Sequence, residues 1–105
     1  MSVLSDLALL LEEVTEEYVV ACDAAAAAEN AAERAELVMF ARLRAEGQAV
    51  AAAEKLARHM AVDERATARI AAATERATLR KVKSVESRLN AAQSHTRFIR
   101  EATGG

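Results

Sequence analysis

An uninterrupted repeat of apolar residues, spaced three and four apart, limits the fold of this chain more than any other feature. Residues at this spacing lie on one side of an α-helix, and a repeat kept over several heptads is typical of coiled-coil packing. The chain has no proline and one internal glycine, so little interrupts a helix. The repeat consists of Leu4, Leu7, Leu11, Val14, Tyr18, Ala21, Ala25, Ala28, Ala32, Ala35 and Met39. We therefore expect an all-α fold.

The internal glycine, Gly47, marks the best break in the chain. It follows Arg42 and Arg44, and a glycine after cations in the last turn is a typical helix stop. A helix that continues through Gly47 is the alternative, and Asp63 is a second candidate for a new helix start. The sequence predicts a single helical domain over residues 1–105, with a helix over about 2–46, a turn near 47 and helical segments over about 48–102.

The second half of the chain carries three shorter apolar stripes. They are Val50, Ala53, Leu56 and Met60, then Val62, Ala66, Ile70, Ala73 and Ala77, then Val82, Val85, Leu89, Ala92, Thr96 and Ile99. Stripes on both segments predict a long helical hairpin with coiled-coil-like packing. The chain has few large side chains to bury, so we also expect a stable homo-oligomer of more than two subunits, a ring being one form. The predicted seam of the core and the oligomer holds Leu4, Leu7, Leu11, Val14, Tyr18, Val82, Val85, Leu89 and Ile99.

Enzyme and membrane functions find little support in the sequence. His59 and His95 lie far apart without ligand partners at metal-binding spacing, and no glycine-rich phosphate loop is present. We expect no catalysis, no cofactor and no metal site. No apolar run approaches the ~20 residues that span a bilayer, so we expect no membrane partner. A single cysteine cannot form an intrachain disulfide, so we expect a cytoplasmic location. The single cysteine, Cys22, is interpreted as a small buried hydrophobic residue.

Charge is unevenly distributed between the two halves of the chain. Residues 1–40 hold nine acidic residues and one basic residue, whereas residues 41–105 hold thirteen basic and seven acidic residues. Within the basic half, a row without a carboxylate repeats at helical spacing: Arg76, Arg80, Lys83, Ser87, Asn90, Ser94 and Arg97. The row extends backwards through Arg69 to Arg65 and would be about 48 Å long in a helix. Such a row can neutralise successive phosphates without reading bases.

Two alternatives to nucleic-acid binding remain for this row. An antiparallel hairpin would place the row against the acidic residues of the first helix, or the same ion pairs would form between subunits. The three aromatic residues, Tyr18, Phe40 and Phe98, are few for binding driven by base stacking. We interpret Phe98 as a core or interface residue, and stacking on a base, beside Arg97, is the other interpretation.

The layout of the chain resembles that of phage recombination mediators of the UvsY type. The resemblance begins near "EEYVVACDAAAAAENAAERAELVMFARLRAEG", a helix that carries a tyrosine and ends in cations and a turn. It continues in "AVDERATARIAAATERATLRKVKSVESRLNAAQSHTRFIREA", where an aspartate opens a long helix, Lys81 and Val82 lie mid-helix, and "RFIR" closes it. It covers most of residues 12–102. This chain is shorter, richer in alanine and poorer in aromatic residues and lysine than the family.

The resemblance implies a function as well as a fold. It implies a ring-like homo-oligomer that binds single-stranded DNA and helps a RecA-type recombinase displace single-strand-binding protein, within the bacterial host cell. The basic positions that match the DNA-facing positions of the family are Arg80, Lys81, Lys83, Arg88, Arg97 and Arg100. Together with the row, the predicted nucleic-acid-binding residues are Arg65, Arg69, Arg76, Arg80, Lys81, Lys83, Arg88, Arg97 and Arg100. The alternative is a structural or inhibitory helical oligomer that acts through protein–protein contacts only, with the acidic half as its working surface.

Overall fold

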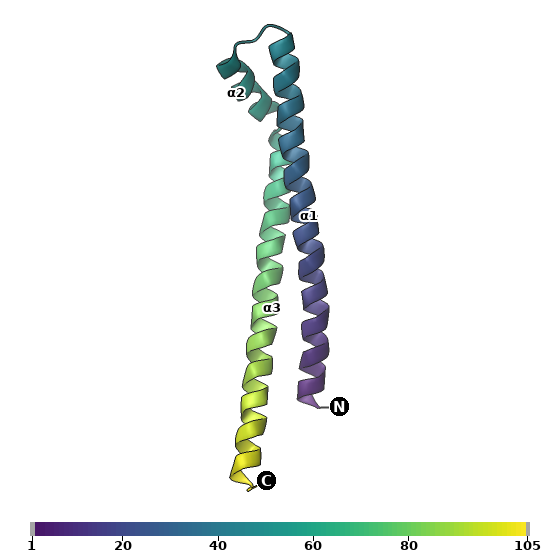
Figure 1. Ribbon diagram of the computed structural model, residues 1–105, viewed down its shortest axis with the longest axis vertical. Coiled ribbons are helices and arrows are strands. Elements are labelled where there is room, and N and C mark those ends of the chain that lie inside the picture. The colour runs from purple at the N-terminus through teal and green to yellow at the C-terminus, as the bar shows by residue number, and fades with distance from the viewer. Residues whose placement is uncertain (1, 105) are drawn as a thin grey trace. The chain divides into compact units, whose positions relative to one another are not determined.

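The computed structural model describes residues 2–104 and is 92% helical, with no strand in that range. Its three helices are α1 (Val3–Ala45), α2 (Val50–Met60) and α3 (Val62–Ala102). α1 and α3 pack as a helical hairpin, which confirms the predicted all-α hairpin fold (Figure 1). The predicted homo-oligomer stays a prediction. None of the helices, over the part of the chain that is described, is long and apolar enough to cross a membrane.

The turn after α1 explains the internal glycine. The N–H of Gly47 donates to the carbonyl of Arg44 at 3.0 Å, and the N–H of Gln48 donates to the carbonyl of Leu43 at 3.0 Å. This pair of bonds satisfies carbonyls that the end of the helix leaves without partners, and it places the glycine in a left-handed conformation. Gly47 has a φ of +95°, and a Cβ atom built there would meet nothing within 4 Å. The glycine is therefore required by backbone conformation and not by lack of space.

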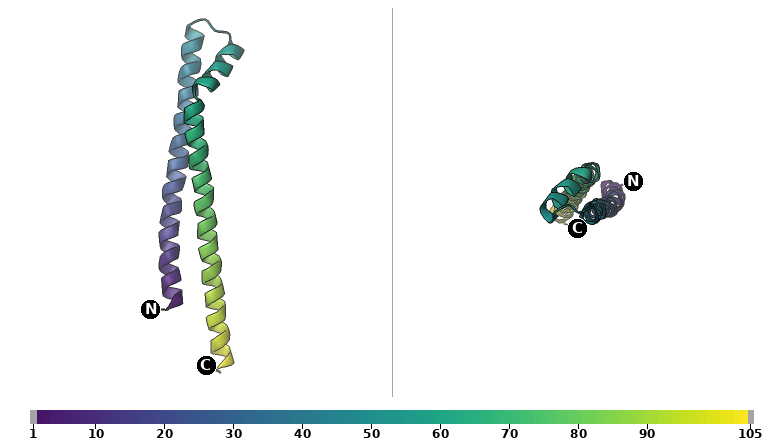
Figure 2. Two further views of the ribbon diagram at one scale, coloured as in Figure 1. Left: turned by 180° about the vertical axis from the view of Figure 1, so that it is seen from behind. Right: turned by 90° about the horizontal axis from the view of Figure 1, so that it is seen from above.

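A single residue, Ala61, separates α2 from α3. Its φ of −95° and ψ of 17° depart from helical values, yet its N–H still donates to the carbonyl of Ala57 at 3.0 Å. Its own carbonyl accepts the N–H of Arg65 at 3.0 Å, so both helices share this residue. α2 consequently lies at an angle to the start of α3 (Figures 1 and 2). Asp63 lies inside the first turn of α3, where its charge complements the helix dipole.

The chain forms two compact units, which we call the terminal unit (residues 1–20 and 76–105) and the turn unit (residues 21–75). The core of the terminal unit consists of Val14, Val82 and Val85, against which Leu10, Leu11 and Tyr18 pack. The core of the turn unit joins the end of α1 to α2: Leu43, Ala53 and Ala57 are buried there, and Met39 and Phe40 pack against them. Both cores are small because six of the eleven buried residues in the described chain are alanines.

The predicted seam residues of the terminal unit differ in how deeply they are buried. Every position of the repeat in α1 is buried or half-buried, the half-buried ones in this unit being Leu4, Leu11 and Tyr18. On α3, Leu89 is half-buried, whereas Ile99 is 48% exposed. The fully buried seam residues are Leu7, Val14, Val82 and Val85.

Two of the predicted stripes in the second half are wrong. Of the α2 stripe only Ala53 is buried, and the stripe at the start of α3 is exposed throughout, with Ile70 at 69% exposure. Over α2 and the start of α3, the turn unit instead buries alanines, namely Ala53, Ala57, Ala61 and Ala68. Small side chains allow helices to approach closely, so the contact follows alanines and leaves the larger residues Val62 and Ile70 outside. Cys22, predicted to be buried, is half-buried and forms no disulfide.

Candidate nucleic-acid interface

The seven residues of the basic row, Arg76 to Arg97 at three–four spacing, all belong to the terminal unit and are all exposed. Successive residues turn by about 100° around a helix. Most of the buried and half-buried positions of α3 in this unit are therefore on roughly the opposite side of the helix from the row, whereas the half-buried Leu79 lies at the edge of the row. The positions on the opposite side include Val82, Val85, Leu89 and Ala92. The basic row consequently faces away from α1, along about 31 Å of helix.

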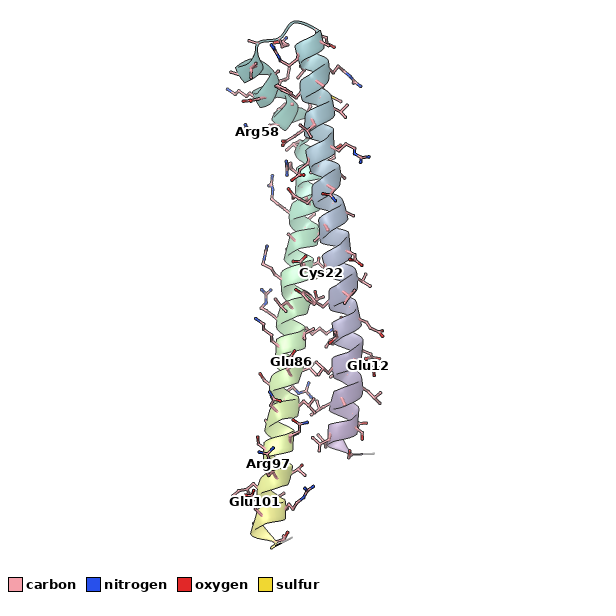
Figure 3. All side chains as sticks on the ribbon, viewed as in Figure 1. Glu12, Cys22, Arg58, Glu86, Arg97 and Glu101 are labelled. Atoms are coloured by element: carbon pink, nitrogen blue, oxygen red, sulfur yellow. The ribbon has the colours of Figure 1, made fainter. Side chains whose placement is uncertain are left out.

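The row contains no carboxylate and ends where one appears. After Arg97 the next position at helical spacing is Glu101, one turn further along α3 (Figure 3). The other acidic residue of α3 in this unit, Glu86, lies one turn from Lys83, at the edge of the row. Between Arg76 and Arg97, the row therefore presents four cations and three neutral hydrogen-bonding side chains.

The cations of the row are not used to hold the hairpin together. Within residues 2–104, no ion pair involves Arg76, Arg80, Lys83 or Arg97. The terminal unit instead pairs Lys81 with Glu17, at 3.0 Å between Lys81 Nζ and Glu17 Oε2. The predicted alternative of pairing within the hairpin therefore applies to Lys81 and not to the row.

Arg65 lies in the turn unit and has a different role from the row. Its guanidinium donates to Glu36 Oε1 and to Glu29 Oε1, each at 2.9 Å, and so links α3 to α1. The side chains of Arg65 and Glu36 are about one-quarter exposed, at 28% and 26%. The hydrogen bond from Arg65 lowers the pKa of Glu36, and the bonds to Glu36 and Glu29 raise the pKa of Arg65. Arg65 is thus occupied by carboxylates of its own chain.

Helix geometry explains why the longer row predicted from sequence divides. The positions on the buried side of α3 repeat every seven residues and so shift around the helix by about 20° per heptad: Ala61, Ala68, Glu75 and Val82. Arg65 and Ala72 each lie four residues after such a position and are half-buried. Arg76 and Lys83 each lie one residue after such a position and are exposed.

The remaining predicted binding residues are exposed but lie off the row. Arg69, in the turn unit, is exposed, and no ion pair within residues 2–104 involves it. Arg88 lies two turns after Lys81 on the same flank of α3, and Arg100 lies on the other flank. Residues 76–105 contain seven basic and two acidic residues, so these cations add to the positive charge of the helix.

The acidic half that the sequence offered as an alternative working surface forms an exposed outer face on α1. Residues 1–20 contain five acidic residues and no basic residue. Glu12, Glu13 and Glu16 are exposed on the side of α1 away from the buried Leu7 and Val14 (Figure 3 labels Glu12). In the sequence, these residues fall opposite the three–four repeat, and that is the signal that identifies the face. The terminal unit therefore carries opposite charges on the outer faces of its two helices.

Comparison with protein-family models, with curated proteins and with solved structures finds no match. The resemblance to UvsY-type mediators stays a prediction. Within residues 2–104, no group of three or more histidine, cysteine, aspartate or glutamate residues is placed to hold a metal ion.

Proposed function

We propose that this protein is a non-enzymatic single-stranded DNA-binding protein and that the basic row of α3 is its binding track. One observation carries the proposal: the seven residues of the row are exposed on the side of α3 away from α1 and include no carboxylate. Cations neutralise phosphates and release counterions, and a carboxylate within the row would repel the phosphates. The layout resemblance to UvsY-type mediators supports a role in recombination.

The chemistry of the row suits a backbone and not a base sequence. Arg76, Arg80, Lys83 and Arg97 would neutralise phosphates and release their counterions. Ser87, Asn90 and Ser94 would donate hydrogen bonds to phosphate or sugar oxygens, which carry no sequence information. Val82 and Val85, buried on the opposite side, hold the track against α1. Binding of this kind is independent of sequence.

A mediator needs this independence, because single-stranded gaps of any sequence must be handed to a recombinase. We include in the proposal that the protein assists loading of a RecA-type recombinase against single-strand-binding protein. We also include self-association, which would bring several tracks to one strand and raise the effective concentration of binding sites.

The proposal is tested by removing two cations of the row together. Arg80→Ala combined with Lys83→Ala should weaken binding to labelled oligo(dT) and make the log–log dependence of affinity on salt shallower by about 1.4, at about 0.7 per contact. Lys55→Ala combined with Arg58→Ala is the matched control on α2, with the same residue types, spacing, exposure and change in charge. Equal effects of the two double variants would mean that only net charge matters, and would reject the track.

A structural oligomer is the second candidate function, and the acidic outer face of α1 favours it. In this arrangement, the basic row of one copy pairs with Glu12, Glu13 and Glu16 of the next, in a head-to-tail assembly. The protein would then act through protein–protein contacts, as a scaffold or an inhibitor. Glu12→Gln combined with Glu16→Gln should lower the mass measured by light scattering, while the wild type would not bind oligo(dT) at low salt. An unchanged mass would reject this candidate.

A further inference from the structure

Phe98 differs from the other aromatic residues of the chain in having no core to occupy. Tyr18 packs against the core of the terminal unit, and Phe40 packs against the core of the turn unit. Phe98 is 68% exposed. The last turns of α3 continue past the start of α1 (Figures 1 and 2). Phe98 belongs to residues 93–104, all of which are exposed. The exposure contradicts the interpretation of Phe98 as a core residue.

The position of Phe98 relates it to the basic row. It follows Arg97, the last cation of the row, and lies one turn after Ser94 on the outer side of α3. Glu101 lies three residues beyond Phe98, and its carboxylate would repel a further phosphate. A strand that follows the row therefore reaches the end of its phosphate contacts beside an exposed phenyl ring.

We propose that Phe98 stacks on an unpaired base at the end of the basic row and so selects single-stranded over double-stranded nucleic acid. The proposal rests on the proposed function, because the row must first bring a strand to α3. Every base offers a face to an aromatic ring, so the contact is sequence-tolerant. Only an unpaired base can unstack from its neighbours and stack on the phenyl ring instead. Phosphate contacts alone would accept a duplex as well.

The chain contains no tryptophan, so Phe98→Trp introduces a single tryptophan, which can be excited selectively in the presence of Tyr18. We expect oligo(dT) to quench its fluorescence at saturation, because the indole stacks on thymine. Ile99→Trp is the matched control. Ile99 is the next residue in the sequence and is also exposed, but it points about 100° further around the helix. The fluorescence of Ile99→Trp should change much less at the same occupancy, measured in parallel by anisotropy of the labelled oligonucleotide.

Phe98→Ala should weaken oligo(dT) binding roughly tenfold, within the range of one lost stacking contact. The salt dependence should stay as in the wild type, because no charge is removed. Affinity for a duplex of the same length should be unchanged, so the preference for single strands falls by the same factor. This difference separates stacking from a general loss of the interface.

The outcomes distinguish a failure of this inference from a failure of the proposed function. Salt-dependent oligo(dT) binding with no quenching of Phe98→Trp, or equal weakening of single-strand and duplex binding by Phe98→Ala, would overturn the stacking role and leave the track intact. A fall in the mass of Phe98→Ala without DNA would show that a second copy covers Phe98, and would also overturn it. No binding of oligo(dT) by the wild type would reject the proposed function and the inference together.

Discussion

Val14 is the buried residue whose truncation should reveal the packing of the terminal unit most clearly. It is 1% exposed and forms the core of that unit with Val82 and Val85. Val14→Ala removes two buried methyl groups, at ~0.8 kcal/mol each, and leaves a small cavity, for a packing loss of about 2 kcal/mol. Alanine is the better helix former and returns ~0.5 kcal/mol. The melting temperature, followed by far-ultraviolet circular dichroism, should fall by roughly 6–12 °C.

Val20→Ala is the matched control for this prediction. It makes the same chemical change on the same helix and in the same unit, but Val20 is 67% exposed. Helix propensity cancels between the two variants, so the difference between them isolates packing. We expect Val20→Ala to melt at or slightly above the wild-type temperature. Equal melting temperatures for the two variants would refute the assignment of Val14 to a buried core.

Two further predictions concern the turn unit. Gly47→Ala should destabilise the protein by about 1–2 kcal/mol, because a Cβ atom disfavours a positive φ, and a melting temperature equal to the wild type would contradict the left-handed conformation at this turn. Arg65→Gln should lower the melting temperature at neutral pH, because Glu29 and Glu36 lose their partner. The contact lowers the pKa of Glu36, so its stabilisation is complete above the ordinary glutamate pKa and is lost as pH falls through the lowered value. The difference in melting temperature between Arg65→Gln and the wild type should therefore be smaller at acidic than at neutral pH. A difference in melting temperature that does not change with pH would exclude this contact.

The sequence predicted the parts of the fold in which large apolar residues and spacing agree. The repeat from Leu4 to Met39 coincides with the buried and half-buried side of α1, and the turn at Gly47 falls where expected. It failed between Val62 and Ala77, where the apolar residues were taken as the contact. Counting back by sevens from Val82 gives Glu75, Ala68 and Ala61, which are buried or half-buried. The buried positions therefore continue the seven-residue spacing of the last stripe. Alanine and glutamate at these positions do not stand out as apolar contact residues in the sequence.

The candidate site was predicted in part for a similar reason. Spacing alone placed the cations from Arg76 to Arg97 on one side of a helix, and the structure shows that side exposed. Whether that side faces α1 depends on how the two helices pair. The spacing of residues along one helix does not show this pairing. Arg65 shows the limit: its spacing suggested membership of the row, but its carboxylate partners lie 29 and 36 residues away in sequence. Phe98 lies outside the last apolar stripe, on the outer side of α3, so its exposure follows from the phase of that stripe.

The salt dependence of oligo(dT) binding by the wild-type protein tests the central claim most directly. Four cations of the row in contact with a single strand predict a log–log slope of about −2.8, at about 0.7 per phosphate contact. The measurement is the fluorescence anisotropy of a labelled oligo(dT) of about 16 nucleotides, the upper end of typical site sizes, between about 50 and 200 mM salt. A slope near −2.8 is the predicted result. The absence of binding at the lowest salt, or an affinity that does not change with salt, would contradict the claim that the basic row is a nucleic-acid track.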